Sequence, residues 1–392
     1  MKTNNNIPAY RFQGYTDAWE LRPLGEIGNT YTGLSGKTKD DFGHGDGRFV
    51  TYMNVFSNPI SLPEMVEAVE IDESQNTVRY GDILFTTSSE TPEEVGMSSV
   101  WLENTENTYL NSFCFGFRPV KKVNPYYLAY LLRSSGMRRK ISFLAQGISR
   151  YNISKTKMME LEISIPNENE QSAIGTFFST LDRNITLHQR KLDTLKEQKK
   201  TYLKLLFPAK GQTQPALRFQ GFEDNWKEVK LGELCDIRTG KLDANAMVEN
   251  GEYDFYTSGI KKYRIDVAEF EGPAITIAGN GATVGYMHLA DGKFNAYQRT
   301  YVLTNFKVDR SYIFSEIAKK LPIKIQQEAR TGNIPYIVLS MLTELLISLP
   351  SLPEQEVIGT FFSTLDQEIA QVEDKLASLK EMKKTLLRKL FV

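Results

Sequence analysis

The sequence predicts an α+β protein with an internal pseudo-twofold duplication, in which two globular domains are separated by an antiparallel two-helix coiled coil. Three observations predict this fold. The segment GTFFSTLD occurs at 175–182 and again, without a substitution, at 359–366. Apolar residues recur at three- and four-residue steps around both copies. Short strand-like runs, followed by helical ones, fill the stretch before each copy.

Bulk composition excludes several classes of protein. A chain of 392 residues is too long for one ordinary core, and a net charge of −1 argues against nucleic-acid binding through total charge. The two cysteines, Cys114 and Cys235, lack the spacing of a zinc site and favour a reduced, cytoplasmic setting. The polar amino terminus and the lack of a long apolar run predict neither a signal peptide nor a membrane span.

The duplication extends well beyond the repeated segment. Residues 165–208 and 349–392 align without a gap and are identical at 24 of 44 positions. A second pair of similar segments opens the two halves, at 8–27 and 215–234. The alignment divides the chain into a first globular domain (1–164), a first long helix (165–208), a second globular domain (209–348) and a second long helix (349–392).

Each long helix carries a narrow apolar seam rather than a broad apolar face, which is typical of a coiled coil. Two such helices in one chain are expected to pair antiparallel, with one globular domain at each end of a rod. The alternative is two separate amphipathic helices, each packed on its own domain. The seam positions are Ile174, Phe178, Leu181, Ile185, His188, Leu192, Leu195, Lys199, Tyr202 and Leu206, and then Ile358, Phe362, Leu365, Ile369, Val372, Leu376, Leu379, Lys383, Leu386 and Leu390.

The stretches before the two helices share an order of elements but little residue identity. Similar helices that frame dissimilar blocks are the pattern expected of two recognition domains with different specificities, held by one symmetric framework. In the first half, strand-like runs at 48–56, 76–89, 98–104 and 112–120 precede a helical run at 124–145. In the second half, strand-like runs at 252–259, 273–281, 284–290 and 299–308 precede a helical run at 311–329.

One stretch of the first half has a strongly segregated charge. Residues 121–159 contain nine cations and no acid. Its end, QGISRYNISKTK at 146–157, mixes Gly, Ser, Arg, Tyr, Asn and Lys, which suits contacts with phosphates and base edges. The alternative interpretation is a solvated basic helix face.

The second half offers related stretches. ARTGNIPYIVL at 329–339 lies at the same offset of 184 residues before its helix, and SGIKKYRI at 258–265 places three cations around an aromatic ring. AGNGATVG at 278–285 resembles a phosphate-cradling loop, but a strand-like run follows it instead of a helix, so it is read as a glycine hairpin. Its counterpart is TTSSETPEEVG at 86–96. A protruding turn at this position could enter a DNA groove.

No catalytic constellation stands out. VNPYY at 123–127 resembles the NPPY motif of amino-methyltransferases, but the second proline and a preceding cofactor loop are missing. Asn124 and Pro125 instead predict the N-cap and first turn of a helix. The three histidines are scattered without ligand or triad spacing. The chain is therefore predicted to be a recognition or scaffold protein and not an enzyme.

The framework repeats, together with GDILFTTSSETPEEVG (81–96) and NISKTKMMELEISIP (152–166), carry a resemblance to a known family. Over essentially its whole length the chain resembles the DNA-specificity subunit of type I restriction–modification systems. The resemblance implies two target-recognition domains, each reading one half of a split, asymmetric site in double-stranded DNA. It also implies that the helices set the spacing and dock two methyltransferase subunits.

Further expectations follow from the same resemblance. The specificity subunit is non-catalytic and holds no cofactor, S-adenosylmethionine belongs to the methyltransferase subunits, and ATP and Mg belong to a restriction/translocase subunit. The alternative function is a non-enzymatic coiled-coil scaffold whose two end domains bind proteins. A self-contained methyltransferase is disfavoured by the missing cofactor loop.

The candidate site residues fall into two groups. Phe177 and Phe361, beside the seam, are candidates for contact with methyltransferase subunits, with core packing as the alternative. The candidate DNA contacts are Thr87, Ser88, Ser89, Arg138, Arg139, Arg150, Tyr151, Asn152, Lys155, Lys157, Lys261, Lys262, Tyr263, Arg264, Asn280, Arg299, Arg330, Thr331 and Asn333.

Overall fold

A computed structural model describes residues 6–328 and 335–392. The chain forms two compact units, and each takes one globular block together with parts of both long helices. Unit 1 is Met1–Gln189 with Lys375–Val392, and unit 2 is Arg190–Asp374. None of the helices in the described ranges is both long enough and apolar enough to cross a membrane.

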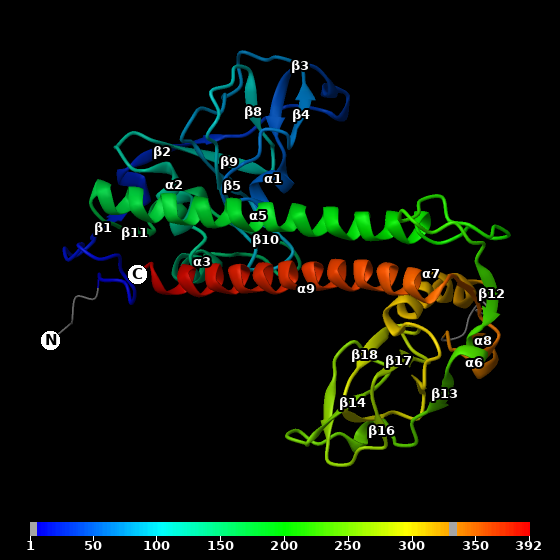
Figure 1. Cartoon of the computed structure of the whole chain (residues 1–392). Helices are drawn as coiled ribbons and strands as arrows, with labels where there is room; N and C mark the ends of the chain where they lie inside the picture. The colour runs from blue at the N-terminus through cyan, green and yellow to red at the C-terminus, as the bar shows by residue number, and fades with distance from the viewer. Residues whose placement is uncertain (1–5, 329–334) are drawn as a thin grey trace. The chain divides into compact units, whose positions relative to one another are not determined.

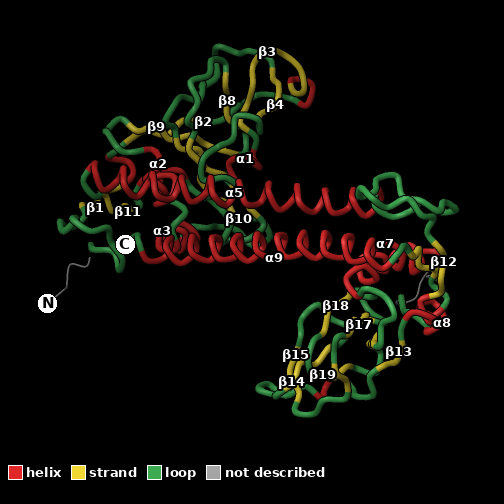
Figure 2. Tube along the Cα trace, viewed as in Figure 1, coloured by secondary structure: helices red, strands yellow, loops and turns green. Residues whose placement is uncertain are grey.

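The globular block of unit 1 is built on two sheets, as Figures 1 and 2 show. In the four-stranded sheet every neighbouring pair is antiparallel, whereas β3 pairs with β8 in parallel and with β4 in antiparallel fashion in the other sheet. The first sheet contains, in spatial order, β2 (Gly28–Thr32), β9 (Cys114–Pro119), β5 (Ile83–Thr86) and β7 (Ser98–Val100). The second contains β4 (Val66–Val69), β3 (Phe42–Val50) and β8 (Thr108–Leu110).

The helices of this block differ in part from the sequence prediction. The predicted strand at 48–56 ends at Val50 and continues as a helix, because Thr51 accepts a hydrogen bond from Asn54 N and caps it. The predicted helix at 124–145 is two helices, the second capped by Ser134. Asn124 is an N-cap with Pro125 in the first turn, as predicted. The helices are α1 (Tyr52–Ser57), α2 (Pro125–Leu131), α3 (Ser135–Phe143) and α4 (Lys155–Met159).

The globular block of unit 2 has two four-stranded sheets. The turn between β17 and β18 is formed by AGNGATVG, which confirms the predicted glycine hairpin. One sheet has the order β13 (Asp236–Thr239), β20 (Thr300–Thr304), β17 (Ala274–Ala278), β18 (Met287–Ala290). The other has β15 (Tyr263–Ile265), β14 (Tyr253–Tyr256), β19 (Lys293–Ala296), β16 (Phe270–Glu271). The helices are α6 (Leu231–Leu234), α7 (Arg310–Glu328) and α8 (Leu339–Thr343).

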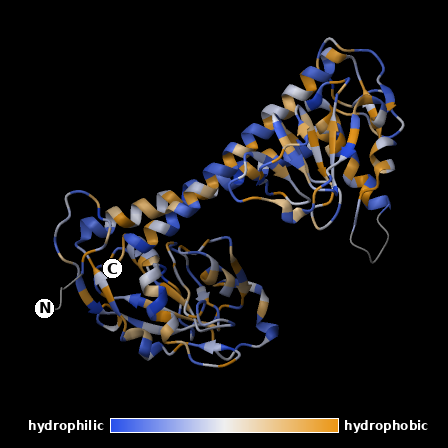
Figure 3. Ribbon diagram, turned by 90° about the horizontal axis from the view of Figure 1, so that it is seen from below, coloured by the Kyte–Doolittle hydropathy of each residue, from blue (hydrophilic) through white to orange (hydrophobic). Residues whose placement is uncertain are grey.

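Two matching strand pairs and two long helices form the duplicated framework. The opening segments contribute β1 (Glu20–Pro23) and β12 (Lys227–Lys230), which pair with β11 (Glu162–Ile165) and β21 (Leu346–Leu349) just before each long helix. The long helices are α5 (Glu168–Leu205) and α9 (Leu352–Lys389), so each begins three residues after its predicted start. Figure 3 shows hydrophobic and hydrophilic residues alternating along them.

The long helices pair with each other, and they do so within each unit. In unit 1, Lys383 of α9 forms an ion pair with Asp182 of α5 at 2.5 Å, and Leu379 lies in the same apolar core as Leu181. Because α9 residues after Lys375 meet α5 residues before Gln189, the two helices run antiparallel there. The predicted antiparallel pairing is thus confirmed for unit 1.

Unit 2 repeats this pairing at equivalent positions. Lys199 of α5 forms an ion pair with Asp366 of α9 at 2.5 Å, and two further cross-helix ion pairs, Lys191–Glu368 and Lys196–Glu373, each close at 2.7 Å. Lys199 and Lys383 were the lysines that interrupt the predicted apolar seams. Their pairing with aspartates of the opposite helix explains how the seams accommodate them.

A phenylalanine that follows the end of each long helix packs into an apolar core formed by residues from other parts of the chain. In unit 1, Phe391 packs against Tyr127 and Phe178, with ring centroids 5.8 and 5.7 Å apart. In unit 2, Phe207 packs against Tyr312 and Phe362 at 5.5 and 5.8 Å. These aromatic clusters fix the start of α2 or α7 against a long helix, and so they position each globular block on its framework.

Candidate nucleic-acid interface

Residues 146–152, within the basic stretch of the first half, form a hairpin whose base is held by hydrogen bonds on both sides. Gln146 and Asn152 exchange two backbone hydrogen bonds, of 2.9 and 2.8 Å. On its outer side, β10 (Tyr151–Asn152) pairs antiparallel with β6 (Ser88–Ser89), which follows β5. The structure thus brings together two stretches, 87–89 and 150–152, that the sequence analysis selected separately.

Arg150 is the charged side chain that this arrangement presents. Its Nε donates to Ser88 Oγ at 3.3 Å, and its guanidinium carbon lies 5.7 Å from the centre of the Phe113 ring. Both contacts orient the guanidinium while the side chain stays exposed. A guanidinium fixed in this way is suited to a bidentate contact with phosphate or with guanine.

A cavity of about 430 Å³ adjoins Arg150. Two aromatic rings of α1, Tyr52 and Phe56, stack at 6.0 Å and lie on its wall, and Tyr52 Oη donates to Ser88 O at 2.7 Å. Burial, the largest cause, raises the pKa of Tyr52, so its hydroxyl stays protonated and can donate. Glu90 and Glu94 add acceptor oxygens to the same cavity. Its lining therefore mixes flat apolar surface with donors and acceptors, which are the groups that read base edges.

Two of the residues predicted to contact DNA are buried in the structure. Ser88 and Ser89 are only 4% and 9% exposed, because both lie in the β6–β10 pair. Through this pairing they hold the hairpin, and Ser88 Oγ accepts from Arg150 Nε, while their contact with DNA stays a prediction. Thr87 is partly exposed, and its Oγ1 donates to Phe113 O at 2.8 Å.

Arg138 is held by contacts within the protein. Its guanidinium donates to the carbonyl oxygens of Glu93, Val95 and Gly96 at 2.6–2.8 Å, and burial lowers its pKa to about 10. Arg138 therefore braces the loop before β7, and its contact with DNA stays a prediction. Arg133, another cation of the basic stretch, is used in the same way by four carbonyl oxygens.

The other predicted cations of the first half lie toward solvent. Arg139 and Lys157 are exposed, and Lys155 is partly buried with its Nζ 5.8 Å from the centre of the Phe115 ring. Lys157 and Lys155 belong to α4, which directly follows the hairpin. Some cations of the basic stretch, Arg133 and Arg138, therefore hold backbone carbonyls within unit 1, and others form a charged surface near the hairpin.

An equivalent arrangement occurs in unit 2. Asn280 forms an isolated antiparallel bridge with Tyr336, which is 184 residues after Asn152. Asn280 Oδ1 accepts a hydrogen bond from Ser258 Oγ at 2.6 Å, and Thr283 Oγ1 donates to Ser258 O. The glycine turn and the loop at 258–265 are thus fastened together beside Tyr336, which is 55% exposed.

The cations of that loop are less free than predicted. Arg264 donates to Asp254 Oδ1 and to the carbonyl oxygens of Gly251 and Glu252, while its side chain remains exposed, so its contact with DNA stays a prediction. Lys262 also contacts Asp254, at 3.1 Å. Lys261 lies over the ring of Tyr263 at 5.4 Å and is exposed.

Arg299 is exposed at the foot of the same turn, where its carbonyl oxygen accepts from Gly279 N at 2.8 Å. The three remaining candidates, Arg330, Thr331 and Asn333, lie outside the described residues. The residues that sequence reasoning missed in these sites are Tyr52, Phe113 and Tyr336. The offset of 184 residues from Asn152 was the signal that could have identified Tyr336.

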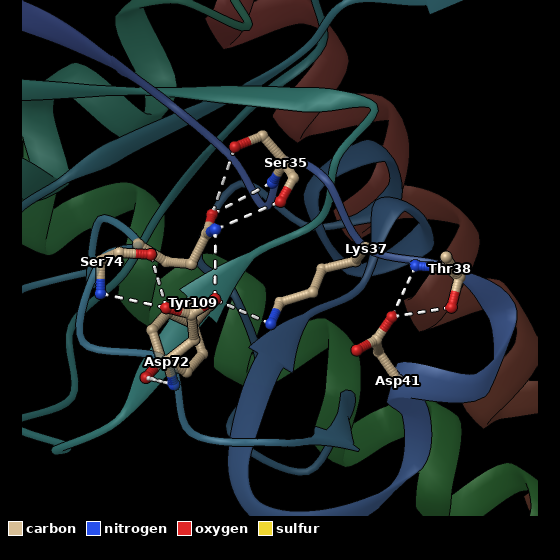
Figure 4. A network of polar contacts seen from close by, with 8 residues as sticks. Ser35, Lys37, Thr38, Asp41, Asp72, Ser74 and Tyr109 are labelled. Atoms are coloured by element: carbon tan, nitrogen blue, oxygen red, sulfur yellow. Dashed lines mark hydrogen bonds and ion pairs between the residues drawn. The ribbon is translucent and has the colours of Figure 1, made fainter.

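A network of polar contacts at another part of unit 1 has a different character, as Figure 4 shows. Lys37 Nζ lies 2.8 Å from Asp72 Oδ2, and this hydrogen bond is the largest of the causes that hold the pKa of Asp72 far below its usual value. In the same segment Asp41 Oδ2 accepts hydrogen bonds from Thr38 N at 2.6 Å and from Thr38 Oγ1 at 2.9 Å. These charges are satisfied internally, so this network stabilises the loops before β3 and after β4 and is not a candidate for DNA contact.

The two candidate partner contacts, Phe177 and Phe361, are both partly buried. Phe177 packs against Phe12 and Phe178, and Phe361 against Phe219 and Phe362, at equivalent positions of the two units. Beside Phe177, a cavity of about 620 Å³ opens along the first turns of α5. Phe177 and Phe361 therefore pack in the framework and keep a remaining exposed edge.

Within the described ranges no group of histidine, cysteine, aspartate or glutamate side chains is placed to hold a metal ion. The two units share a pair of loops that hydrogen bonds hold together on the duplicated framework, with polar and aromatic side chains beside them. Such an arrangement can bind a ligand through the exposed side chains of these loops.

Known proteins share both the sequence pattern and the fold. The sequence model of the type I restriction modification DNA specificity domain matches residues 16–197 and 223–381. The specificity subunit of the Escherichia coli type I restriction enzyme EcoDI is 37% identical over 164 residues, which are 42% of this chain and 36% of that protein. A putative type I specificity subunit of Mycoplasma genitalium is 26% identical over 268 residues, 67% of this chain and 69% of that protein.

The crystal structure of a type I restriction–modification S subunit from M. genitalium has the same fold, with a TM-score of 0.72, 19% identity, and coverage of 98% of this chain and 99% of that one. The relatives are named specificity subunits, which confirms the predicted resemblance to a non-catalytic subunit. Because the matched sequence model covers both halves, the chain belongs to the type I restriction–modification DNA specificity domain family.

Proposed function

We propose that this chain reads a bipartite, asymmetric site in double-stranded DNA, with each globular block reading one half. The observation that carries the proposal is that the two units hold loops of different sequence and structure at equivalent positions of the same framework. The hairpin at 146–152 meets β6 in unit 1, and Tyr336 meets the glycine turn in unit 2. Unlike loops imply unlike half-sites, despite the duplicated framework.

In the first half-site, affinity and selectivity come from different groups. Arg139 and Lys157 neutralise phosphates and release counterions, which gives affinity without sequence preference. Arg150, oriented by Ser88 and Phe113, reads a base edge or clamps a phosphate beside the cavity at α1. In the second half-site, Lys261 and Arg299 supply charge, and Asn280 with Tyr336 supplies polar and aromatic contacts.

Two adenine-methyltransferase subunits dock on the framework, one at each copy of the Phe177 or Phe361 surface. Equivalent surfaces on one chain favour identical partners. The cavity at the start of α5 and the partly exposed ring of Phe177 support a docking position there. In such an assembly the methyltransferase subunits bind S-adenosylmethionine and methylate adenine. A restriction/translocase subunit, with ATP and Mg, joins through the complex.

The decisive experiment exchanges residues 30–160 for the corresponding block of a relative and reads the modified bases by methylation-sensitive sequencing of host DNA. We expect one half of the modified motif to change and the other to remain. A change in both halves would contradict reading by separate blocks. Absence of any modified motif, with a chain that still captures other proteins, would favour a coiled-coil scaffold.

A further inference from the structure

The hairpin of unit 1 exposes apolar surface where charge would be expected. Among the described residues, the two large apolar side chains with the highest exposed fractions are Ile148, at 96%, and Phe143, at 90%. The next value is 69%, for Val120. Both residues lie within the basic stretch, between Arg139 and Arg150. Large exposed apolar side chains that gather in one segment indicate a surface that is covered by a partner.

Ile148 lies on a hairpin whose backbone is held in place by hydrogen bonds. It lies at the tip of the hairpin whose base is fixed by the paired hydrogen bonds of Gln146 and Asn152 and by β6. Gly147, with φ +140°, makes the tight bend before it, and a Cβ there would lie 2.1 Å from Arg150 O. Only glycine allows this path. The tip is therefore a narrow, preformed prong with an isoleucine at its end.

The charges around the prong identify its partner. Arg150 follows the tip two residues later, and Lys155 and Lys157 lie on the helix that comes next. The segment from 121 to 159 contains no acid. Along the sequence the apolar tip is flanked only by cations, and Glu90 and Glu94 of another segment lie on the cavity beside Arg150. An apolar tip within a cationic segment fits a polyanion with an apolar interior better than it fits a protein surface. Duplex DNA has this construction, since phosphates enclose stacked bases.

We propose that Ile148 is a wedge that enters one base step of the DNA half-site read by the first block and unstacks it. The inference rests on the proposed function of DNA reading. Isoleucine is among the side chains that proteins insert between base pairs, where burial of the side chain offsets part of the unstacking free energy. Arg150 would hold the adjacent backbone or base edge while the tip is inserted.

Comparison of the two halves of the sequence restricts the wedge to the first block. The residue 184 positions after Ile148 is Gly332, and the residue equivalent to Phe143 is Gln327. The second block therefore carries no apolar side chain at the equivalent positions of its sequence. Unstacking is expected in the first half-site and not at the corresponding step of the second.

The test uses the full chain assembled with its methyltransferase subunits and duplexes that contain the motif found by methylation sequencing. 2-Aminopurine replaces one base at a time, and its fluorescence reports unstacking when the complex binds. Three proteins are compared: the unaltered chain, Ile148→Ser, and the matched control Val120→Ser. Binding is measured in parallel by titration of the same duplexes.

With the unaltered chain, fluorescence should rise at one step of the first half-site. Ile148→Ser should abolish that rise but weaken binding by less than about tenfold, because the lost contact and the avoided distortion partly offset each other. Val120→Ser should behave like the unaltered chain. The second half-site serves as an internal reference in every titration.

Three results would overturn the wedge. One is tight, specific binding by the unaltered chain without a rise at any step of the first half-site. Another is a rise that persists in Ile148→Ser. The third is loss of methyltransferase subunits from the Ile148→Ser complex, which would assign the prong to protein contact. If the unaltered complex binds no specific sequence at all, the proposed function itself fails, a result that binding measurements separate from the first three.

Discussion

The two units share buried contacts at equivalent positions of their framework, but the loops that the framework carries differ. Arg11 binds buried Glu170 in unit 1 with two hydrogen bonds of 2.7 Å, and Arg218 binds buried Glu354 in unit 2 with two of 2.8 Å. Tyr127 and Tyr312 likewise each donate to the carbonyl of a serine on the strand that precedes a long helix. The same buried network was thus retained twice.

The repeated glycine shows why the framework tolerates little change. A Cβ at Gly175 would lie 2.7 Å from Tyr126 Cβ, and one at Gly359 would lie 2.4 Å from Asp309 Oδ1. Each glycine lets a long helix approach the start of α2 or α7 closely. Reading loops carry no such constraint, so they diverge: a pinned hairpin in unit 1 and a glycine turn fastened to Tyr336 in unit 2.

The largest expected effect tests whether the two buried networks are equal. Glu170 accepts from Arg11 and also from Trp19 Nε1 at 3.2 Å, whereas Trp226 Nε1 has no hydrogen-bond partner among the residues that the structure describes. Glu170→Ala and Glu354→Ala should each lower the free energy of unfolding of their unit by about 3–5 kcal/mol, because each removes a buried carboxylate and leaves a mostly buried arginine with only its contact to Asp17 O or Asp224 O. The loss should be larger for Glu170→Ala by about 1 kcal/mol.

Hydrogen exchange of the amides of α2 and α7 would report the two units separately. The matched control is Arg22→Ala, because its ion pair with Glu20 is exposed and should contribute less than about 1 kcal/mol. Equal losses for the two glutamates would show that the Trp19 hydrogen bond adds nothing to unit 1.

The second prediction separates a reading arginine from a bracing one. Arg150→Ala should weaken binding to the specific duplex by about 1–3 kcal/mol without changing the stability of unit 1. If Arg150 contacts phosphate, the slope of log affinity against log salt should become shallower by about one. Arg138→Ala should instead destabilise unit 1, since its three carbonyl contacts are lost.

DNA titrations at several salt concentrations and thermal unfolding provide both readouts. Lys261→Ala is the corresponding variant in unit 2, and it should affect affinity but not stability. Unchanged affinity and salt slope for Arg150→Ala would remove that residue from the interface.

The third prediction concerns the ion pairs between the long helices. Lys383–Asp182 in unit 1 and Lys199–Asp366 in unit 2 occupy equivalent positions and are both partly exposed. Double-mutant cycles on the two pairs should give similar coupling energies of about 0.5–1 kcal/mol. A coupling that differs clearly between the units would show that helix pairing, and not only the reading loops, has diverged.

The smallest effect is a dependence on pH confined to unit 2. Burial, the largest cause, lowers the pKa of His288 below its ordinary value of 6.5. Between the folded and unfolded pKa values the unfolded chain binds more protons, so the free energy of unfolding falls as the pH drops below about 6.5. It levels off once the pH is below the folded pKa.

Comparison of unfolding at pH 7.5 and 5.5, for the unaltered chain and for His288→Gln, would measure this contribution. The variant should lose part of the pH dependence of unit 2 and leave unit 1 unchanged. A dependence that is identical in both proteins would assign it to other groups.

The sequence by itself determined the duplication, the two long helices and their antiparallel pairing, because these depend on periodic apolar residues that recur along the chain. It also selected the stretch at 146–157 for its polar and basic composition and predicted the glycine turn at 278–285. It could not distinguish Arg150 from Arg138, since both are arginines in one basic stretch. Only the tertiary structure decided that Arg138 meets three carbonyl oxygens and that Arg150 stays exposed.

The same limit applies to Ser88 and Ser89, whose sequence suggests a polar loop but which β-pairing with Tyr151 and Asn152 buries. Burial and hydrogen bonding between segments far apart in the chain depend on three-dimensional packing. Local composition does not encode them. Periodicity, by contrast, is a local property, and it therefore sufficed to predict the framework.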